Sequence, residues 1–140
     1  MSLYLDTNVL IALLLPDALA GRSENLLANN QSDLAVSDFA AAEFASVISR
    51  KVRTAALSRR EGQDVLGRFD RRLAADMTLI EMAAVDLSLA ASYLRRLDLA
   101  LMLPDAIHIA IADRLGTVLV TFDQQMASAA RALGLAVVEA

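Results

Sequence analysis

The chain has 140 residues, 56% of them hydrophobic, so it can form a substantial core, and we expect a single domain over residues 1–140. The absence of Cys and the presence of one His exclude a disulfide framework, a thiolate zinc site and any site that needs two imidazoles. A net charge of −4 argues against a general nucleic-acid binder. The uncharged runs are shorter than the ~18–20 residues of a membrane span and no signal-peptide pattern is present, so we expect a cytoplasmic protein without a membrane partner.

Short apolar runs alternate along the chain with longer runs that have helical spacing. In the first half, the pattern predicts a strand at 3–5, a helix at 9–15, a break at Pro16 and Asp17, a helix at 19–28 that Asn29 and Asn30 end, a strand at 34–36 and helices at 38–53 and 59–73. In the second half, it predicts a strand at 77–81, a helix at 86–96, an apolar loop at 97–103, a helix at 104–115, a strand at 118–120, a helix at 124–133 and a strand at 135–138.

Three of the helices have specific boundary signals. Ser37 is a good N-cap for the 38–53 helix, and Ser58 with Glu61 fits a capping box. Pro104 near the start and Gly116 past the end delimit the 104–115 helix. Because strands and helices alternate with short connections, we expect an α/β fold of three layers, with a parallel sheet covered by helices on both faces.

Four carboxylates occupy positions that this fold would bring together. Asp6 and Asp123 each follow a strand that is expected to be buried, and ligands bind at the carboxyl edge of such sheets. Glu43 lies on the apolar face of its helix, where a solvated Glu is not expected. Asp105 opens a helix that is apolar nearly all round, so its first turn is expected to be buried as well.

Each of these acids also has a structural interpretation. Asp6 and Asp123 can cap the helices that follow them, Asp105 can complement a helix dipole, and Glu43 can pair with an Arg. If each acid had only its own structural role, four independent acids would lie at one edge of the sheet by chance, so one shared role explains their positions more simply. Clustered carboxylates repel each other, and hard cations with oxygen ligands, Mg²⁺ or Mn²⁺, relieve that repulsion.

Other polar residues are interpreted as structural. We interpret Asp86 and Asp113 as solvated helix positions, and His108 as a hydrogen-bonded helix histidine rather than a ligand. The segment from Arg50 to Arg72 has eight basic and three acidic residues, a net charge of +5 on an otherwise acidic chain. It indicates a local basic face, although a solvated helical hairpin explains such a run equally well.

Four segments, LYLDTNVLIALL, AAEF, LPDAIHIAIA and LVTFD, together resemble the PIN domain, and more narrowly the VapC type of bacterial toxin, a small ribonuclease. The resemblance spans essentially the whole chain. It implies a parallel sheet of about five strands with the first strand central. It also implies a ribonuclease site with Mg²⁺ or Mn²⁺ held by four acids and flanked by three polar residues: Asp6, Glu43, Asp105 and Asp123, with Thr7, Asn8 and Thr121.

The expected function is therefore a Mg²⁺-dependent endoribonuclease that hydrolyses RNA phosphodiester bonds by metal-activated water. The resemblance further implies a homodimer and a VapB-type antitoxin as partners. The candidate contacts to RNA phosphates are Arg50, Lys51, Arg53, Arg59 and Arg60. In one departure from the family pattern, Gln124, Gln125 and Met126 follow Asp123, where relatives often carry another acid or an aromatic residue, so the number of metal ions stays open.

Other functions remain as alternatives. A degenerate PIN-like module without catalysis would be expected to lack some of the acids. An aspartate-dependent phosphatase needs a second Asp at the position of Asn8, and a phospho-accepting receiver needs a Lys late in the chain, whereas the only one is Lys51.

Overall fold

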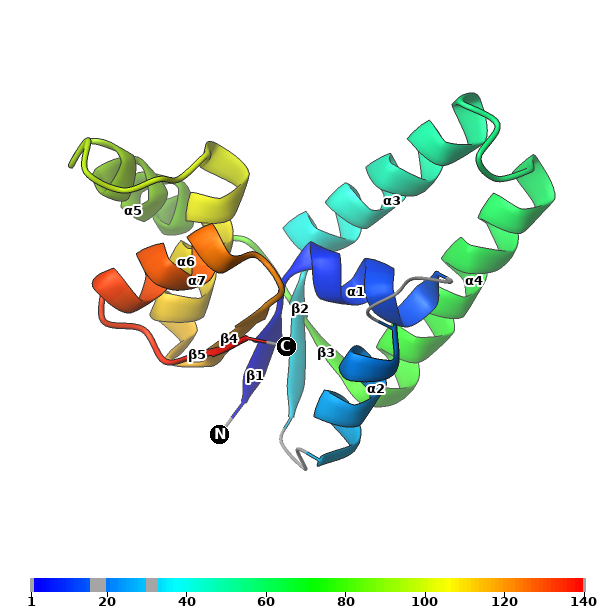
Figure 1. Cartoon of the computed structure of the whole chain (residues 1–140), viewed down its shortest axis with the longest axis horizontal. Helices are drawn as coiled ribbons and strands as arrows, with labels where there is room; N and C mark the ends of the chain where they lie inside the picture. The colour runs from blue at the N-terminus through cyan, green and yellow to red at the C-terminus, as the bar shows by residue number, and fades with distance from the viewer. Residues whose placement is uncertain (1, 16–19, 30–32, 140) are drawn as a thin grey trace.

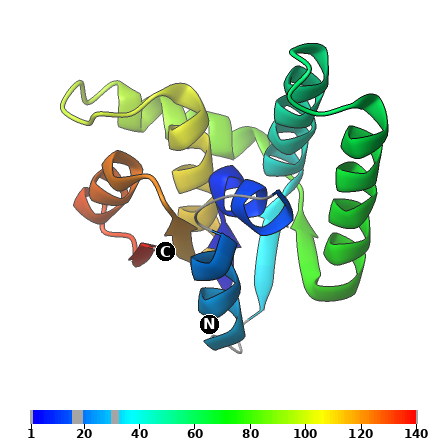
Figure 2. The same ribbon diagram turned by 45° about the vertical axis from the view of Figure 1, so that its right-hand side comes forward.

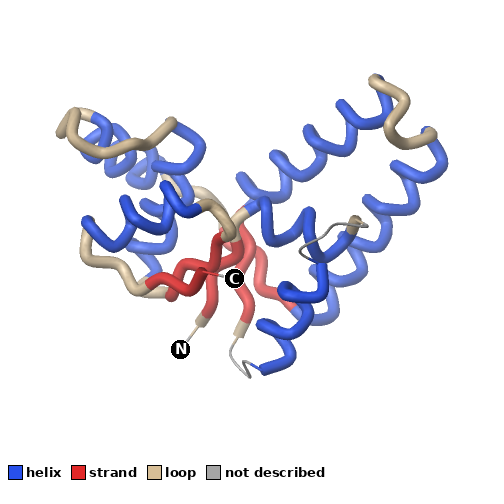
Figure 3. The backbone as a smooth tube through the Cα atoms, in the orientation of Figure 1, coloured by secondary structure: helices blue, strands red, loops and turns tan. Residues whose placement is uncertain are grey.

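The computed structural model describes residues 2–15, 20–29 and 33–139. At its centre lies a sheet of five parallel strands, which confirms the predicted fold class (Figures 1 and 3). In spatial order these strands are β3 (Met77–Ile80), β2 (Leu34–Ser37), β1 (Leu3–Leu5), β4 (Val118–Thr121) and β5 (Val137–Glu139). The first strand is thus central, as expected.

Helices cover both faces of the sheet (Figure 1). One face carries α1 (Thr7–Leu14), α2 (Ala20–Asn29), α3 (Asp38–Arg53) and α4 (Arg59–Asp76). The other carries α5 (Ala84–Leu94), α6 (Leu103–Leu115) and α7 (Gln124–Ala132). No helix of the described residues combines the length and the apolar character needed to cross a membrane.

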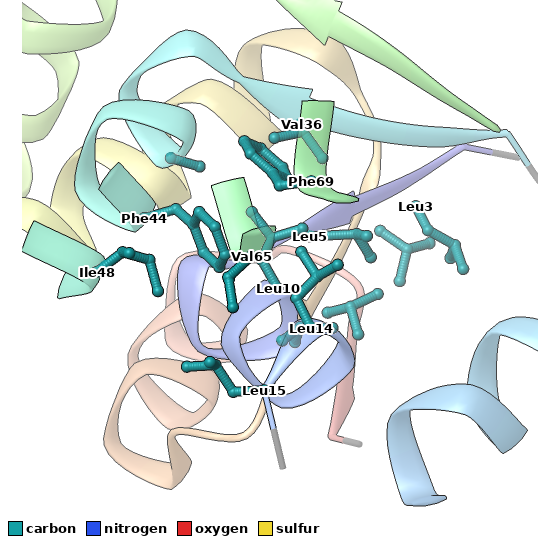
Figure 4. Close-up of a cluster of buried hydrophobic side chains, with 14 residues drawn as sticks. Leu3, Leu5, Leu10, Leu14, Leu15, Val36, Phe44, Ile48, Val65 and Phe69 are labelled. Atoms are coloured by element: carbon teal, nitrogen blue, oxygen red, sulfur yellow. The ribbon is translucent and has the colours of Figure 1, made fainter. Parts of the chain in front are cut away.

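The strand alternation explains why there are two cores. Leu3 and Leu5 of β1 point into the cluster beneath α1, α3 and α4, whereas Tyr4 points into the cluster beneath α6 and α7. Their register partners on β4 divide in the same way. Figure 4 shows the first cluster, in which Phe44 of α3 packs near Phe69 of α4. A central strand buried on both faces holds whatever follows it in a fixed position.

The predicted helix boundaries are confirmed where specific side chains set them. Ser37 Oγ accepts a hydrogen bond from Ala40 N at 2.9 Å, and Ser58 forms the capping box with Glu61. Gly116 ends α6 with φ of 66°, a conformation that favours glycine. The predicted break at 16–17, the start at residue 19 and the end at residue 30 lie outside the described residues.

The interpretation of Asp86 as solvated is wrong. Asp86 is fully buried where α5 packs on α6, and it accepts hydrogen bonds from Arg114 Nε at 2.6 Å and from an Arg114 terminal nitrogen at 3.0 Å. Ala83 N donates to the same carboxylate at 2.7 Å. Helical spacing alone does not reveal this burial, because Arg114 lies on another helix.

The helices α3 and α4 form an antiparallel hairpin whose tip lies away from the sheet (Figures 1 and 2). Gly62 of α4 lies at the crossing, where an added Cβ would come within 2.6 Å of Val52 Cγ2. The absence of a side chain at this position lets the two helices approach closely. The hairpin therefore places the predicted basic segment at the periphery of the molecule.

Candidate functional site

The connections of the sheet reverse direction between β1 and β4. From β1 the chain continues to β2 and β3 on one side, and β4 and β5 lie on the other side. In open α/β sheets, ligands bind at the carboxyl ends of the strands next to such a reversal. Asp6 follows β1 and Asp123 lies two residues after the end of β4, so both acids occupy this place.

Asp6 is held rigidly at the junction of β1 and α1. It is 5% exposed, its Oδ1 accepts from Thr7 N at 2.6 Å, and its Oδ2 accepts from Thr121 Oγ1 at 2.9 Å. Burial raises the pKa of Asp6 above its ordinary value, although the hydrogen bonds from Thr121 and Thr7 act in the opposite direction. Asp6 therefore caps α1 and also faces the switch point, so the two interpretations of this residue coexist.

The end of β4 is tied to the start of α1 by a small polar network. Asn8 Nδ2 donates to Thr121 Oγ1 at 3.4 Å, and Asn8 Oδ1 accepts from Phe122 N at 3.3 Å. Asp123 N donates to Thr121 Oγ1 at 3.0 Å, and Asp123 Oδ1 caps α7. Thr121 Oγ1 therefore links the backbone of Asp123 to the carboxylate of Asp6, and the capping interaction uses only Oδ1 of Asp123.

Glu43 reaches the same place from the middle of α3. Its side chain is 28% exposed, and its Oε1 accepts hydrogen bonds from Thr7 Oγ1 at 2.7 Å and from His108 Nε2 at 2.5 Å. Partial burial alone would raise the pKa of Glu43, but the hydrogen bonds from His108 and Thr7 hold it below its ordinary value. Glu43 is thus a carboxylate kept in its charged form.

Asp105 is the fourth acid and lies in the first turn of α6. Burial, followed by the charges of Asp6 and Asp123, raises the pKa of Asp105. In the described part of the chain it has neither a hydrogen-bond donor nor an ion-pair partner. The expected burial of the whole first turn is wrong, because Leu103 and Pro104 are exposed and only Asp105 is partly buried. The helix becomes buried from Ala106 onward, where it meets the sheet.

His108 lies next to these acids, and it is hydrogen-bonded through both ring nitrogens, as its interpretation from the sequence expected. The ring is 1% exposed, and Nε2 lies 3.6 Å from Asp6 Oδ1 as well as 2.5 Å from Glu43. The sequence does indicate that His108 lies near Asp105, since it follows Asp105 by three residues and therefore lies on the same face of the helix. The sequence does not reveal which neighbour that face meets.

The donor chemistry of the site fits a hard divalent cation. Four carboxylates supply the oxygen ligands that Mg²⁺ and Mn²⁺ prefer, and in the described ranges none of them pairs with Lys or Arg. The same described residues contain no preformed group of three acid or imidazole side chains positioned around one ion. The acids therefore lie close enough to perturb one another electrostatically without forming a finished coordination sphere.

The five candidate RNA contacts lie at the tip of the α3–α4 hairpin. Arg50 and Arg53 on α3 and Arg59 and Arg60 on α4 are exposed, whereas Lys51 is half-buried. At the ~1.5 Å rise per residue of a helix, Arg50 is about 10 Å along α3 from Glu43. The basic tip is thus separate from the acids, with the body of α3 between them.

Comparison with known proteins gives a family and a set of similar folds. The PIN domain family model matches residues 3–132. VapC20 of Mycobacterium tuberculosis, a toxin that cleaves the sarcin–ricin loop, is 21% identical with a TM-score of 0.75, and the match covers 99% of this chain and 98% of that one.

Two further structures are similar along most of their length. VapBC2 of Rickettsia felis, bound to a DNA fragment from its promoter, is 18% identical with a TM-score of 0.73 over 99% of this chain and 98% of that one. A toxin–antitoxin complex from Klebsiella pneumoniae is 20% identical with a TM-score of 0.62 over 88% and 87%. At these identities the likeness shows the fold. No curated protein matches the sequence significantly.

Proposed function

The chain belongs to the PIN domain family, and from this premise we propose that it is a metal-dependent endoribonuclease that hydrolyses RNA phosphodiester bonds. One observation supports the proposal: burial and the charges of Asp6, Asp123 and Glu43 raise the pKa of Asp105, and none of these four acids pairs with Lys or Arg in the described residues. Asp6, Glu43, Asp105 and Asp123 would hold Mg²⁺ or Mn²⁺. Such an ion, when bound, activates water and neutralises charge on a phosphoryl group.

The residues of the chain would orient the site. Thr121 Oγ1 and Thr7 N each donate to one oxygen of the Asp6 carboxylate. Asn8 Oδ1 accepts from Phe122 N and so ties the end of β4 to α1. Thr7 Oγ1 joins this network to Glu43. Preorganised carboxylates of this kind place charge without rearrangement during the reaction.

The activity test compares neutral variants that retain the shape of the side chain. Asp6→Asn and Asp105→Asn should each abolish Mg²⁺-dependent cleavage of total RNA while circular dichroism shows the same fold. The matched control is Asp98→Asn, because Asp98 is an exposed acid that pairs with Arg96 outside the site. Cleavage by either site variant at the wild-type rate would reject the assignment, and no cleavage by wild type with Mg²⁺ or Mn²⁺ would favour a PIN-like module without catalysis.

We further propose that the basic tip contacts RNA phosphates. Replacing Arg50 and Arg53 by Gln should weaken RNA binding and reduce the slope of log K against log salt by about 0.7 for each lost phosphate contact. Arg72→Gln is the control, because Arg72 already pairs with Glu24 and Asp76. An unchanged slope in the double variant would contradict contact at the tip.

The proposed biological role is that of a dimeric toxin inhibited by a small VapB-type antitoxin. Apolar side chains of the segment that precedes Asp105 in the chain are unusually exposed, namely Leu97 at 91%, Met102 at 74% and Leu103 at 47%. An antitoxin segment with an apolar stripe would bury them, and an Arg on it could pair with the acids. The names of the similar structures, a VapBC pair and a toxin–antitoxin complex, support this role.

Light scattering, on the protein alone and mixed with the product of the adjacent gene, tests the partners. We expect a homodimer that forms a larger complex and loses cleavage activity. Met102→Ser should weaken that complex, whereas Leu79→Ser on the edge strand β3, also exposed at 51%, should not. A monomer that does not bind the protein encoded by the adjacent gene would contradict the toxin role, but it would not contradict the nuclease proposal.

A further inference from the structure

His108 is fixed on every side in a way that filling the core does not require. Its Nδ1 lies 2.7 Å from the Tyr4 hydroxyl, and that hydroxyl lies 2.8 Å from Ser37 Oγ. The rings of Phe39 and Tyr4 lie 5.2 Å and 5.8 Å from the imidazole. Because Ser37 also caps α3, the ring of His108 is anchored to β1 and to the start of the helix that carries Glu43.

The hydrogen-bond partners determine which way this chain of bonds runs. An ionised carboxylate can only accept, so His108 Nε2 must carry the hydrogen that points to Glu43 Oε1. In the neutral ring Nδ1 then accepts from the Tyr4 hydroxyl, whose oxygen accepts from Ser37 Oγ. Every hydrogen along this path has an acceptor.

Both donors to Glu43 bind the same oxygen. Thr7 Oγ1 and His108 Nε2 each contact Oε1, and neither contacts Oε2. The carboxylate is therefore held by one oxygen and free of these donors at the other. Hydrogen bonds of this kind to ligating groups fix their orientation and keep them charged.

We propose that His108 is a positioning residue that orients Glu43 for a divalent cation, by donating from Nε2 to Oε1 so that Oε2 stays available to the ion. This inference rests on the proposed function, since it takes the four acids as the cation site. It assigns no direct contact between His108 and the ion or the RNA.

The first test measures Mn²⁺ binding to the full chain by calorimetry, without RNA. His108→Gln retains a donor near the position of Nε2, whereas His108→Asn has its amide near Nδ1 and cannot reach Glu43. We expect Mn²⁺ affinity to fall about 10–100-fold in His108→Asn and to stay within about threefold of wild type in His108→Gln. Raising the Mn²⁺ concentration should restore RNA cleavage by His108→Asn, which a damaged fold would not permit.

A second variant keeps the inference testable if His108→Asn does not fold. Thr7→Val removes the other donor to Oε1 with little change of shape, and it should weaken Mn²⁺ binding in the same direction but by less. Equal losses in His108→Gln and His108→Asn, or no loss in either, would overturn the positioning role. Tighter Mn²⁺ binding by His108→Asn would also overturn it, because His108 would then compete with the ion for Glu43.

A measurement without metal separates this inference from the proposed function. His108 is the only histidine of the chain, so the ring ¹⁵N signals of labelled protein come from this residue alone, and their couplings to the ring carbon-bound hydrogens distinguish Nε2 from Nδ1. We expect a hydrogen on Nε2 at neutral pH, and a ring without it would overturn the inference whatever the metal data show. If wild type has that hydrogen but binds no Mn²⁺, the proposed function and the inference both fail. If it binds Mn²⁺ and the His108 variants bind equally, only the inference fails.

Discussion

Asp86 and Arg114 form a buried ion pair, and we predict that removing one partner destabilises the protein more than removing the other. Asp86 is fully buried, whereas the Arg114 side chain is 31% exposed. Arg114→Met leaves a buried carboxylate with Ala83 N as its remaining donor, but Asp86→Asn leaves a guanidinium that can still reach water. Losing the cation should therefore destabilise the protein more than losing the anion.

The magnitudes follow from the burial of the two partners. Breaking a fully buried pair by removing one partner costs about 3–5 kcal/mol, and the partial exposure of Arg114 places its loss at the low end, about 3 kcal/mol. Asp86→Asn loses charged hydrogen bonds but leaves no buried charge, so we expect about 1.5–2 kcal/mol. The double variant should be less destabilised than Arg114→Met alone, because no unpaired charge remains.

Urea denaturation followed by circular dichroism measures these differences. The hydrogen bonds from Arg114 and Ala83 outweigh burial and hold the pKa of Asp86 below its ordinary value of 3.8. A depressed folded-state pKa contributes stability above pH 3.8 that is lost as the pH falls through the folded pKa, so the deficit of Asp86→Asn should shrink in acid. A smaller loss in Arg114→Met than in Asp86→Asn, or additive losses in the double variant, would refute this reasoning.

Three further predictions concern the site and the hairpin. Burial and neighbouring acids raise the pKa of Asp105, so Asp105→Asn should become more stable relative to wild type as the pH rises above 3.8, and a pH series of urea midpoints that shows no such trend would contradict this. Gly62→Ala should destabilise the protein by about 1–3 kcal/mol, because the added Cβ would clash with the Val52 side chain. Gly67→Ala should instead stabilise it by about 0.5–1 kcal/mol, because the added Cβ faces only the flexible end of Arg71 and Ala favours a helix over Gly. Thermal melting of the two variants measures both effects. If metal-activated water is the nucleophile, the RNA fragments should carry 5′-phosphate and 3′-hydroxyl ends, and 2′,3′-cyclic phosphates found by end labelling would exclude that mechanism.

Local sequence determined the elements and the places of the acids. The apolar run before Asp6 marks the central strand, and Ser37, Ser58 and Gly116 define helix ends through bonds or dihedral angles within a few residues. Such features depend on neighbours along the chain, so they can be predicted without knowing the fold. The parallel sheet also follows from the alternation of strands and helices.

The partners of buried polar groups could be decided only by the tertiary structure. Asp86 has the spacing of a solvated helix residue, yet the packing of α5 on α6 buries it against Arg114, 28 residues away. His108 is separated from Glu43 by 65 residues and from Tyr4 by 104. Local spacing predicts on which face of a helix a side chain lies, but the residues that this face contacts depend on strand order and helix packing. The free energy of burying a charge depends on these tertiary contacts. The sequence therefore nominates four acids as a candidate site, but it does not show that His108 forms a hydrogen bond with Glu43.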